Sequence, residues 1–124
     1  MGELPMHQFF SLGVQKMRSV EKITVNNKGG YVFNFSVQWL GSDGKWATSN
    51  WNSGNYPVAQ SRTTPSLSEI GVPADALAVT VYGHAVAGTS GQGTPFVSYA
   101  ANGQIATYDA VGTTYIGFAI NLIE

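Results

Sequence analysis

The stretch YVFNFSVQW, residues 31–39, decides the fold that we predict for this chain. Large apolar side chains stand at every second position, and smaller or polar side chains stand between them. A period of two is typical of a β-strand with one buried face and one wetter face. The apolar positions are Tyr31, Phe33, Phe35, Val37 and Trp39. Because these side chains need a second layer to cover them, the stretch predicts a two-layered β-protein.

Further strands are predicted on both sides of this stretch, separated by residues that favour turns. Gly29-Gly30 precedes it, and Ser42-Asp43-Gly44 follows it as a hairpin signal. The other predicted strands are residues 21–26, 45–51, 56–64, 76–86, a hairpin of 96–99 and 104–108 around Asn102-Gly103, and 113–123. We expect residues 65–75 to be a connector and residues 88–93 a flexible loop. About eight closely spaced strands favour an all-β fold, an antiparallel two-sheet β-sandwich with a short N-terminal arm.

The apolar positions of two predicted strands are assigned to the core. In residues 76–86 they are Leu77, Val79 and Val81, and in residues 113–123 they are Ile116, Phe118, Ile120 and Leu122. Of two further aromatics, Trp46 and Trp51, one should point outward, because five positions separate them along one strand.

The chain length of 124 residues fits one domain, which we divide into an arm, residues 1–19, and a sandwich, residues 20–124. The arm is apolar but has no regular period. Phe9, Phe10 and Leu12 are its candidate contacts. They could pack on the chain's own domain or reach a neighbouring subunit of a homo-oligomer, and the sequence leaves both open.

The composition restricts the possible partners. The net charge is −1 and only 10% of the residues are charged, which argues against nucleic-acid binding. An uncharged polar surface is common in carbohydrate binders and in proteins covered by other subunits. No apolar run is long enough for a transmembrane segment, and no signal peptide is visible at the N-terminus. A secreted or surface-associated location is favoured, although the compartment stays undetermined.

No motif for catalysis or metal binding is present. The chain has no Cys, its two histidines are His7 and His84, and no nucleophile, phosphate-loop or zinc pattern occurs. We therefore expect no enzyme activity, no cofactor and no metal. Trp51, with Asn55 and Tyr56 after it, could stack on a sugar or dip into a lipid interface. A subunit contact or ordinary partial burial would explain Trp51 equally well.

Four motifs, in order, resemble the C-terminal β-sandwich domain of the cholesterol-dependent (thiol-activated) cytolysins. Gly29-Gly30-Tyr31-Val32 with Phe35, Val37 and Trp39 is similar to that domain's opening strand. Trp51 with Gly54-Asn55-Tyr56 is similar to its W-x-G-N-Y, with one extra residue. Residues 76–81 match its alternating strand, and Gly112-Thr113-Thr114 matches its G-T-T. The resemblance runs from about residue 20 to 124.

This resemblance implies a stand-alone sandwich whose loops at one end touch a membrane. Family members use a Thr-Leu pair to contact cholesterol and a Trp-rich loop to enter the bilayer. Here the pair would be Thr114-Tyr115, and the second loop, residues 87–95, has no Trp. These departures weaken the expectation of cholesterol binding, and the absence of the family's pore-forming domains argues against autonomous pore formation.

We therefore predict a non-enzymatic, lectin-like or membrane-binding module that recognises a glycan or lipid surface. Its candidate loops are residues 88–94 and 111–115, joined by residues 51–56. The candidate ligand-binding residues are Trp51, Asn55, Tyr56, Thr89, Gln92, Thr113, Thr114 and Tyr115. The alternative is a self-assembling structural subunit that uses its arm and its low-charge faces.

Overall fold

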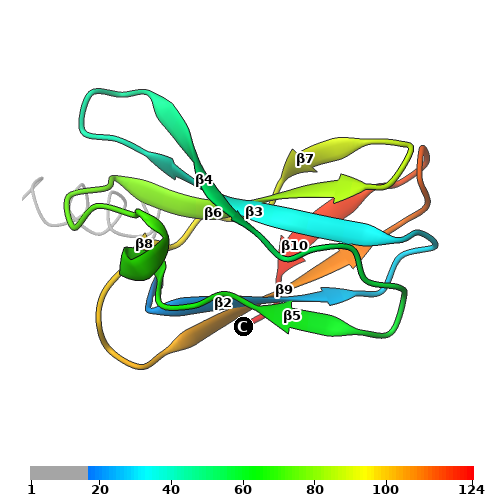
Figure 1. Cartoon of the computed structure of the whole chain (residues 1–124), viewed down its shortest axis with the longest axis horizontal. Helices are drawn as coiled ribbons and strands as arrows, with labels where there is room; N and C mark the ends of the chain where they lie inside the picture. The colour runs from blue at the N-terminus through cyan, green and yellow to red at the C-terminus, as the bar shows by residue number, and fades with distance from the viewer. Residues whose placement is uncertain (1–16) are drawn as a thin grey trace, which may run out of the picture.

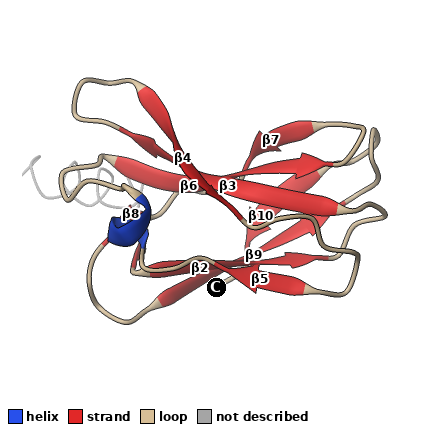
Figure 2. Cartoon of the chain, in the orientation of Figure 1, coloured by secondary structure: helices blue, strands red, loops and turns tan. Residues whose placement is uncertain are grey.

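The computed structural model describes residues 17–124, which form two four-stranded sheets packed face to face (Figure 1). Nearly all regular structure is strand, with one turn of 3-10 helix (Figure 2). The elements are β1 (Ser19–Val20), β2 (Lys22–Asn27), β3 (Phe33–Leu40), β4 (Trp46–Asn52), β5 (Ser61–Thr63), η1 (Leu67–Ile70), β6 (Ala78–Ala85), β7 (Ser90–Gln92), β8 (Ser98–Tyr99), β9 (Ile105–Val111) and β10 (Ala119–Leu122). The predicted two-sheet sandwich is confirmed.

One layer, the β3 sheet, has the strand order β4-β3-β6-β7 and is antiparallel throughout. The predicted strand at residues 31–39 forms its centre as β3, which pairs along its whole length with β6. Tyr31, Phe33, Phe35 and Val37 are all buried, as the alternation predicted. Trp39 lies near the end of the strand, where it is partly buried and packs against the edge of the core.

The other layer, the β2 sheet, has the order β10-β9-β2-β5. Its central pair, β2 with β9, is parallel, whereas its outer pairs are antiparallel. Parallel neighbours require a crossover. Here the crossover is the chain between β2 and β9, which contains all four strands of the β3 sheet. β9 then starts at the same end of the sandwich as β2 and runs parallel to it.

Several segments differ from their sequence predictions. The strand predicted at residues 56–64 is reduced to β5, because residues 57–60 form a turn. Residues 96–99 and 104–108 do not pair as a hairpin, because β8 pairs with β1 while β9 lies between β2 and β10. The flexible loop predicted at residues 88–93 contains β7, which extends the β3 sheet. The last strand is only Ala119–Leu122. Ile116, assigned to the core, is 77% exposed, and Leu77 is 50% exposed, because both lie in connections outside the strands.

Other predicted features are present. Val79, Val81 and Ile120 are buried in the core, and the connector carries η1 with Leu67 inside. Of the two tryptophans on β4, Trp46 points outward and is 39% exposed. Trp51 packs edge-on against Phe35, with 5.4 Å between the ring centroids. The predicted contacts Phe9, Phe10 and Leu12 lie outside the described residues, and the boundary of the arm stays a prediction.

The connections fall into two groups, one at each end of the sandwich. Residues 28–32, 53–60, 86–89 and 112–118 form the end that we call the loop end, on the right in Figure 1. Residues 41–45, 64–77 and 100–104 form the opposite end, here called the hairpin end. The loops predicted to bind a ligand therefore cluster at the loop end, with the exceptions given below.

Candidate functional site

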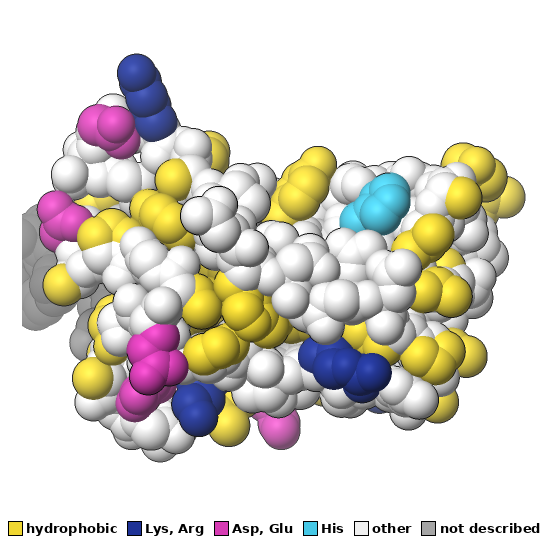
Figure 3. Space-filling view, in the orientation of Figure 1, with side chains coloured by type: hydrophobic (Ala, Val, Ile, Leu, Met, Phe, Trp, Pro, Cys, Tyr) yellow, Lys and Arg dark blue, Asp and Glu magenta, His cyan; other side chains and the backbone are white. Residues whose placement is uncertain are grey.

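The loop end carries the most exposed apolar side chains of the described residues. Tyr115 is 76% exposed and Ile116 is 77% exposed, and both project from the connection between β9 and β10. Val32, Val58 and Val86, in the three other connections of this end, are also exposed. In Figure 3, apolar atoms are visible at this end, as they are elsewhere on the same face. Contiguous apolar surface on a small protein commonly marks an interaction site.

A closed turn holds Tyr115 and Ile116 at the tip of their loop. The backbone N–H of Thr113 donates to the carbonyl of Ile116 at 2.8 Å, and the Ile116 N–H donates to the Thr113 hydroxyl at 3.0 Å. Gly112 begins the loop with a positive φ of 87°, a conformation that favours glycine. The turn is thus fixed by its own hydrogen bonds, and its two large side chains are left outside.

Neighbouring connections are tied to this loop. The Gly30 N–H donates to the Gly112 carbonyl at 2.9 Å, and the Thr89 hydroxyl donates to the Thr114 carbonyl at 2.8 Å. Gly88 lies so close to Thr114 that an added Cβ would meet the threonine methyl at 1.9 Å. Since these contacts link three connections, the loop end is a single structured surface.

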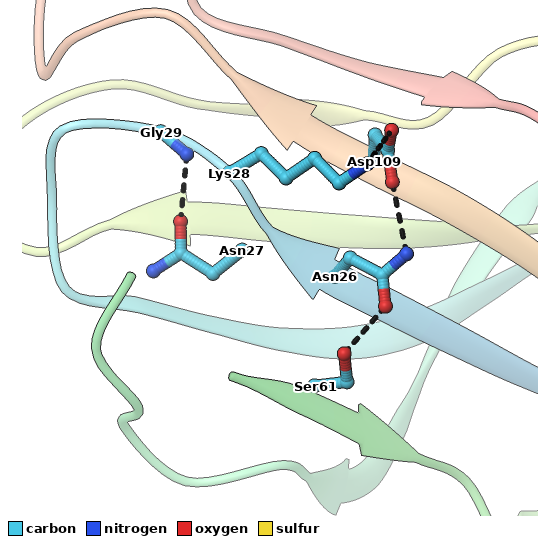
Figure 4. A network of polar contacts seen from close by, with 6 residues as sticks. All are labelled: Asn26, Asn27, Lys28, Gly29, Ser61 and Asp109. Carbon is cyan, nitrogen blue, oxygen red and sulfur yellow. Dashed lines mark hydrogen bonds and ion pairs between the residues drawn. The ribbon is translucent and has the colours of Figure 1, made fainter. Parts of the chain in front are cut away.

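Asn27, fully buried at the end of β2, organises the base of the loop end. Its side-chain amide donates to the carbonyls of Tyr31 at 2.8 Å and Tyr56 at 3.2 Å, and its Oδ1 accepts from the Gly29 N–H at 3.0 Å. Its backbone carbonyl accepts from Ala59 at 2.7 Å. One side chain therefore joins two loops (Figure 4 shows its bond to Gly29). We missed this role because Asn before Lys-Gly-Gly has the composition of an ordinary turn.

Charge at the loop end is largely neutralised within the protein. Lys28 Nζ lies 3.1 Å from Asp109 Oδ2, and Asn26 donates to the other oxygen of this carboxylate at 3.0 Å (Figure 4). Ser61 in turn donates to Asn26 Oδ1. No acidic side chain visible in Figure 3 lies at this end, whereas Asp43, Glu69 and Asp75 lie in η1 and the connections of the hairpin end.

Burial raises the pKa of three tyrosines around the core. Tyr31, which donates its hydroxyl to the Val111 carbonyl, has a pKa raised to about 12, and so has Tyr108. The pKa of Tyr56 is raised further, against the opposing effect of Arg62, whose guanidinium lies 4.7 Å from the ring centre. Desolvation is the main cause in each case, so these phenols stay neutral well above neutral pH.

Of the predicted ligand-binding residues, Tyr56 is buried and Trp51 is partly covered. Tyr56 is 1% exposed and donates its hydroxyl to the Val25 carbonyl at 2.8 Å, so its assignment as a contact residue is wrong. Trp51 is half-buried against Phe35, so its ring is not free for stacking as we expected. Both belong to the inner side of the sandwich, where an aromatic ring contributes most by burial.

The other predicted residues fall into two surfaces. Asn55, Thr89, Thr113, Thr114 and Tyr115 lie at the loop end. The hydroxyls of Thr89 and Thr113 hold the backbone there, and the exposed Asn55 accepts a hydrogen bond from Asn34. Tyr115 is the large apolar side chain among them that is mostly exposed. Gln92 lies apart from them, on β7.

His84 is the histidine of the described residues, and its side chain contacts a hydroxyl. His84 Nδ1 lies 2.7 Å from the Ser90 Oγ, but no hydrogen bond joins His84 to a carboxylate in residues 17–124. The same residues contain no cluster of three or more His, Asp or Glu side chains arranged for a metal ion. No described helix has the length and apolar character needed to cross a bilayer.

Comparisons with known proteins found no matching family model and no similar curated protein. Solved structures with a similar fold include listeriolysin O, 17% identical with a TM-score of 0.46 over 83% of this chain and 22% of that chain. A Gram-negative toxin is 17% identical, with a TM-score of 0.47 over 85% of this chain and 23% of the toxin chain. The membrane-binding domain of pneumolysin is 13% identical, with a TM-score of 0.45 over 84% of this chain and 96% of that domain. This chain spans less than a quarter of the whole toxins.

Proposed function

We propose that the chain is a non-enzymatic module that binds a lipid membrane surface through its loop end. The observation that carries the proposal is the pair Tyr115 and Ile116, each about three-quarters exposed at the tip of a hydrogen-bonded loop. Exposing such side chains to water is unfavourable, and a lipid interface covers them. A tyrosine beside an aliphatic residue also suits an interface, because its ring is apolar and its hydroxyl is polar.

The expected affinity of one copy is modest. Full burial of an isoleucine side chain contributes about 2 kcal/mol, and two such side chains contribute a few kcal/mol together. Even a single myristoyl chain, which buries more apolar surface than these two side chains, binds membranes with a constant of only about 10⁴ M⁻¹. Stable attachment then requires a second contact, supplied by further copies or by another ligand.

Electrostatics contributes little to this proposed contact. Lys28 already pairs with Asp109. Arg62 of β5 lies nearby as a single further cation, with its guanidinium bonded to Gln60 Oε1 and the Ser61 carbonyl. Attraction to anionic headgroups needs a cluster of unpaired basic side chains. We therefore expect binding to neutral phosphatidylcholine vesicles, with a weak dependence on ionic strength.

The sequence resemblance supports the same surface. By this resemblance, Thr114-Tyr115 would correspond to the Thr-Leu pair with which cytolysins contact cholesterol. Tyr replaces Leu here, and the neighbouring connection, residues 86–89, has no Trp. We accordingly propose contact with the bilayer interface, without a requirement for sterol.

Vesicle co-sedimentation with matched variants tests the proposal. Ile116→Ala should weaken binding to phosphatidylcholine vesicles about thirtyfold, since it removes about 2 kcal/mol of burial. Ile105→Ala is the control, because Ile105 is also exposed but lies at the start of β9 at the hairpin end. Equal loss in both variants, or no binding by the unaltered chain, contradicts the proposal.

Light scattering distinguishes the structural alternative, self-assembly. If Ile116→Ala converts an oligomer into a monomer and vesicle binding is absent throughout, the exposed pair is a subunit contact and the membrane proposal fails. If the chain has the same mass with and without the substitution while vesicle binding falls, the proposal stands.

A further inference from the structure

A second surface, the outer face of the β3 sheet, is polar but carries no Lys, Arg, Asp or Glu. The polar residues that alternate with the buried positions along β3, β4, β6 and β7 and keep some exposure are Asn34, Ser36, Gln38, Thr48, Asn52, Tyr82, His84, Ser90 and Gln92. In Figure 3 the surface around the histidine is mostly white, the colour of uncharged polar side chains and backbone. By contrast, the β2 sheet carries Lys22 and Asp109 on its outer face.

The register of the sheet places these side chains in rows across the strands. Ser36 of β3 lies opposite Asn52 of β4 and Tyr82 of β6, and Tyr82 lies opposite Gln92 of β7. This row therefore crosses all four strands. The next row toward the loop end contains Asn34, His84 and Ser90. Side chains in register on one face are neighbours, so the rows form one continuous surface.

Hydrogen bonds between the side chains fix their orientation. Asn52 donates to Ser36 Oγ at 2.9 Å, and its Oδ1 accepts from the Gly54 N–H at 2.8 Å. Gln92 donates to Gln38 Oε1 at 2.8 Å, and Gln38 donates to Thr48 Oγ1 at 3.1 Å. Each amide has two donor hydrogens and an acceptor oxygen with two lone pairs. Bonding within the row leaves part of this capacity for a ligand while holding the amides in place.

Two aromatic side chains lie on the same outer face. Tyr82, 38% exposed, stands in the row that crosses the sheet, and Trp46, 39% exposed, stands opposite Leu40 near the hairpin end. The ring of Phe96 packs edge-on against Trp46, with 5.2 Å between the ring centroids. Leu40 pairs with Trp46 on one side and with Ala78 of β6 on the other, so Trp46 is level with Ala78. Ala78 is four residues before Tyr82 on β6, which separates Trp46 from Tyr82 by roughly 13 Å along the strands. Such spacing fits an extended chain better than a compact ligand.

We propose that this outer face binds an uncharged oligosaccharide, as a site separate from the loop end. Sugar hydroxyls both donate and accept hydrogen bonds, as the fixed amides do, and the C–H faces of sugar rings pack on aromatic rings. The lack of charge over the rows gives no attraction for sulfated or sialylated chains or for charged protein surfaces. The polar rows also give an acyl chain nothing to pack against.

Measuring the affinity of the chain for oligosaccharides tests this proposal. The probes are neutral hexasaccharides of glucose, mannose and N-acetylglucosamine. The controls are sialylated and sulfated oligosaccharides. At least one neutral probe should bind, and Tyr82→Ala should weaken it at least tenfold while Tyr82→Phe retains it. Gln92→Ala should weaken it severalfold, and Thr63→Ala on the other outer face should leave it unchanged. Circular dichroism verifies that each variant is folded. If Tyr82→Ala does not fold, Gln92→Ala alone decides.

Failure to bind any neutral probe, binding of anionic probes only, or equal affinity in the Tyr82→Ala and Gln92→Ala variants overturns the proposal. Failure of the loop-end proposal is a separate result, because Ile116→Ala should leave oligosaccharide affinity unchanged. Vesicles carrying a neutral glycolipid distinguish the source of the sugar. If they compete with the free hexasaccharide for the Tyr82 face, a membrane headgroup is a ligand, and if they do not compete, the free polysaccharide is the ligand.

Discussion

The hydroxyl of Tyr115 donates a 2.8 Å hydrogen bond to the carbonyl oxygen of Ala87. This bond joins the loop that carries the most exposed side chains to the turn between β6 and β7. It also fixes the tyrosine ring across the gap between the two connections, although the ring is largely in water. The position of the ring at the surface is therefore built into the loop end before any ligand arrives.

Tyr115→Phe should distinguish the contribution of this hydrogen bond from the contribution of the aromatic ring, because it removes the hydroxyl and keeps the ring. We expect the free energy of unfolding to fall by about 1 kcal/mol or less, because the lost bond is exposed. Binding to phosphatidylcholine vesicles should be retained, whereas Tyr115→Ala should weaken it at least tenfold, since the ring itself is removed. Denaturant unfolding and vesicle co-sedimentation measure the two effects, and equal vesicle affinity in the Phe and Ala variants would rule out a role for the ring.

Ala87 has a left-handed backbone with φ of 65°, which is unfavourable for an L-residue with a Cβ. Ala87→Gly should therefore raise the free energy of unfolding by about 1 kcal/mol. Ala85→Gly, two residues earlier, is the control, because Ala85 is fully buried in β6 and glycine weakens a strand. Denaturant unfolding should show a higher free energy of unfolding for Ala87→Gly and a lower one for Ala85→Gly. A change in the same direction for both variants contradicts this explanation.

Gly112 and Gly103 both have positive φ, but only Gly112 is crowded. A Cβ on Gly112 would meet the Gly117 carbonyl oxygen at 2.1 Å, whereas one on Gly103 would meet nothing within 4 Å. Gly112→Ala should cost about 2 kcal/mol more than Gly103→Ala, because the backbone of the loop must move. The Gly112 variant should also lose vesicle binding. Similar unfolding midpoints for the two variants would show that the loop end is not packed as described.

Asn27→Ala should be among the most destabilising substitutions in the chain. It leaves the buried carbonyls of Tyr31 and Tyr56 without their side-chain donor, which costs about 2–4 kcal/mol in total. Asn27→Asp keeps the shape and removes both donors, so it should cost at least as much. Asn50→Ala, at an exposed position of β4, should change the free energy of unfolding by less than about 0.5 kcal/mol.

The buried tyrosines predict alkaline unfolding. The pKa of Tyr108 is about 12 in the folded protein, against about 10 when the chain is unfolded. Above pH 10 the unfolded state loses this proton first, so the stability contributed by the neutral phenol is complete below pH 10 and falls up to pH 12. The slope reaches about 1.4 kcal/mol per pH unit for Tyr108. Tyr108→Phe should flatten the dependence of unfolding free energy on pH in this window, and an unchanged slope would contradict the assignment.

Strict alternation made the central strand predictable, and the same rule failed where the backbone leaves the strand. Phe33, Phe35 and Val37 are buried as expected because β3 is regular and has neighbours on both sides. Ile116 and Phe118 continue the same period of two, but Gly112 and Gly117 bend the chain with positive φ and carry Ile116 into solvent. Periodicity reports spacing along the chain and not the direction of the backbone.

The candidate site was less accessible to sequence reasoning, because it depends on pairings between distant segments. Thr89 and Thr114 were both selected, yet their hydroxyl and carbonyl bond to each other and support the loop. Tyr56 looked like a surface aromatic in a polar loop, but its bridge to Phe33 draws it into the core. The rows on the β3 sheet required the register of four strands, and no local pattern contains it.

The parallel pairing of β2 with β9 also orders events in time. During synthesis β2 leaves the ribosome long before β9 exists, so its inner edge stays unpaired while the whole β3 sheet is made. Contacts between such distant segments slow folding. A nascent chain halted before residue 105 therefore presents an open strand edge, and we expect such fragments to be recognised by chaperones or to aggregate.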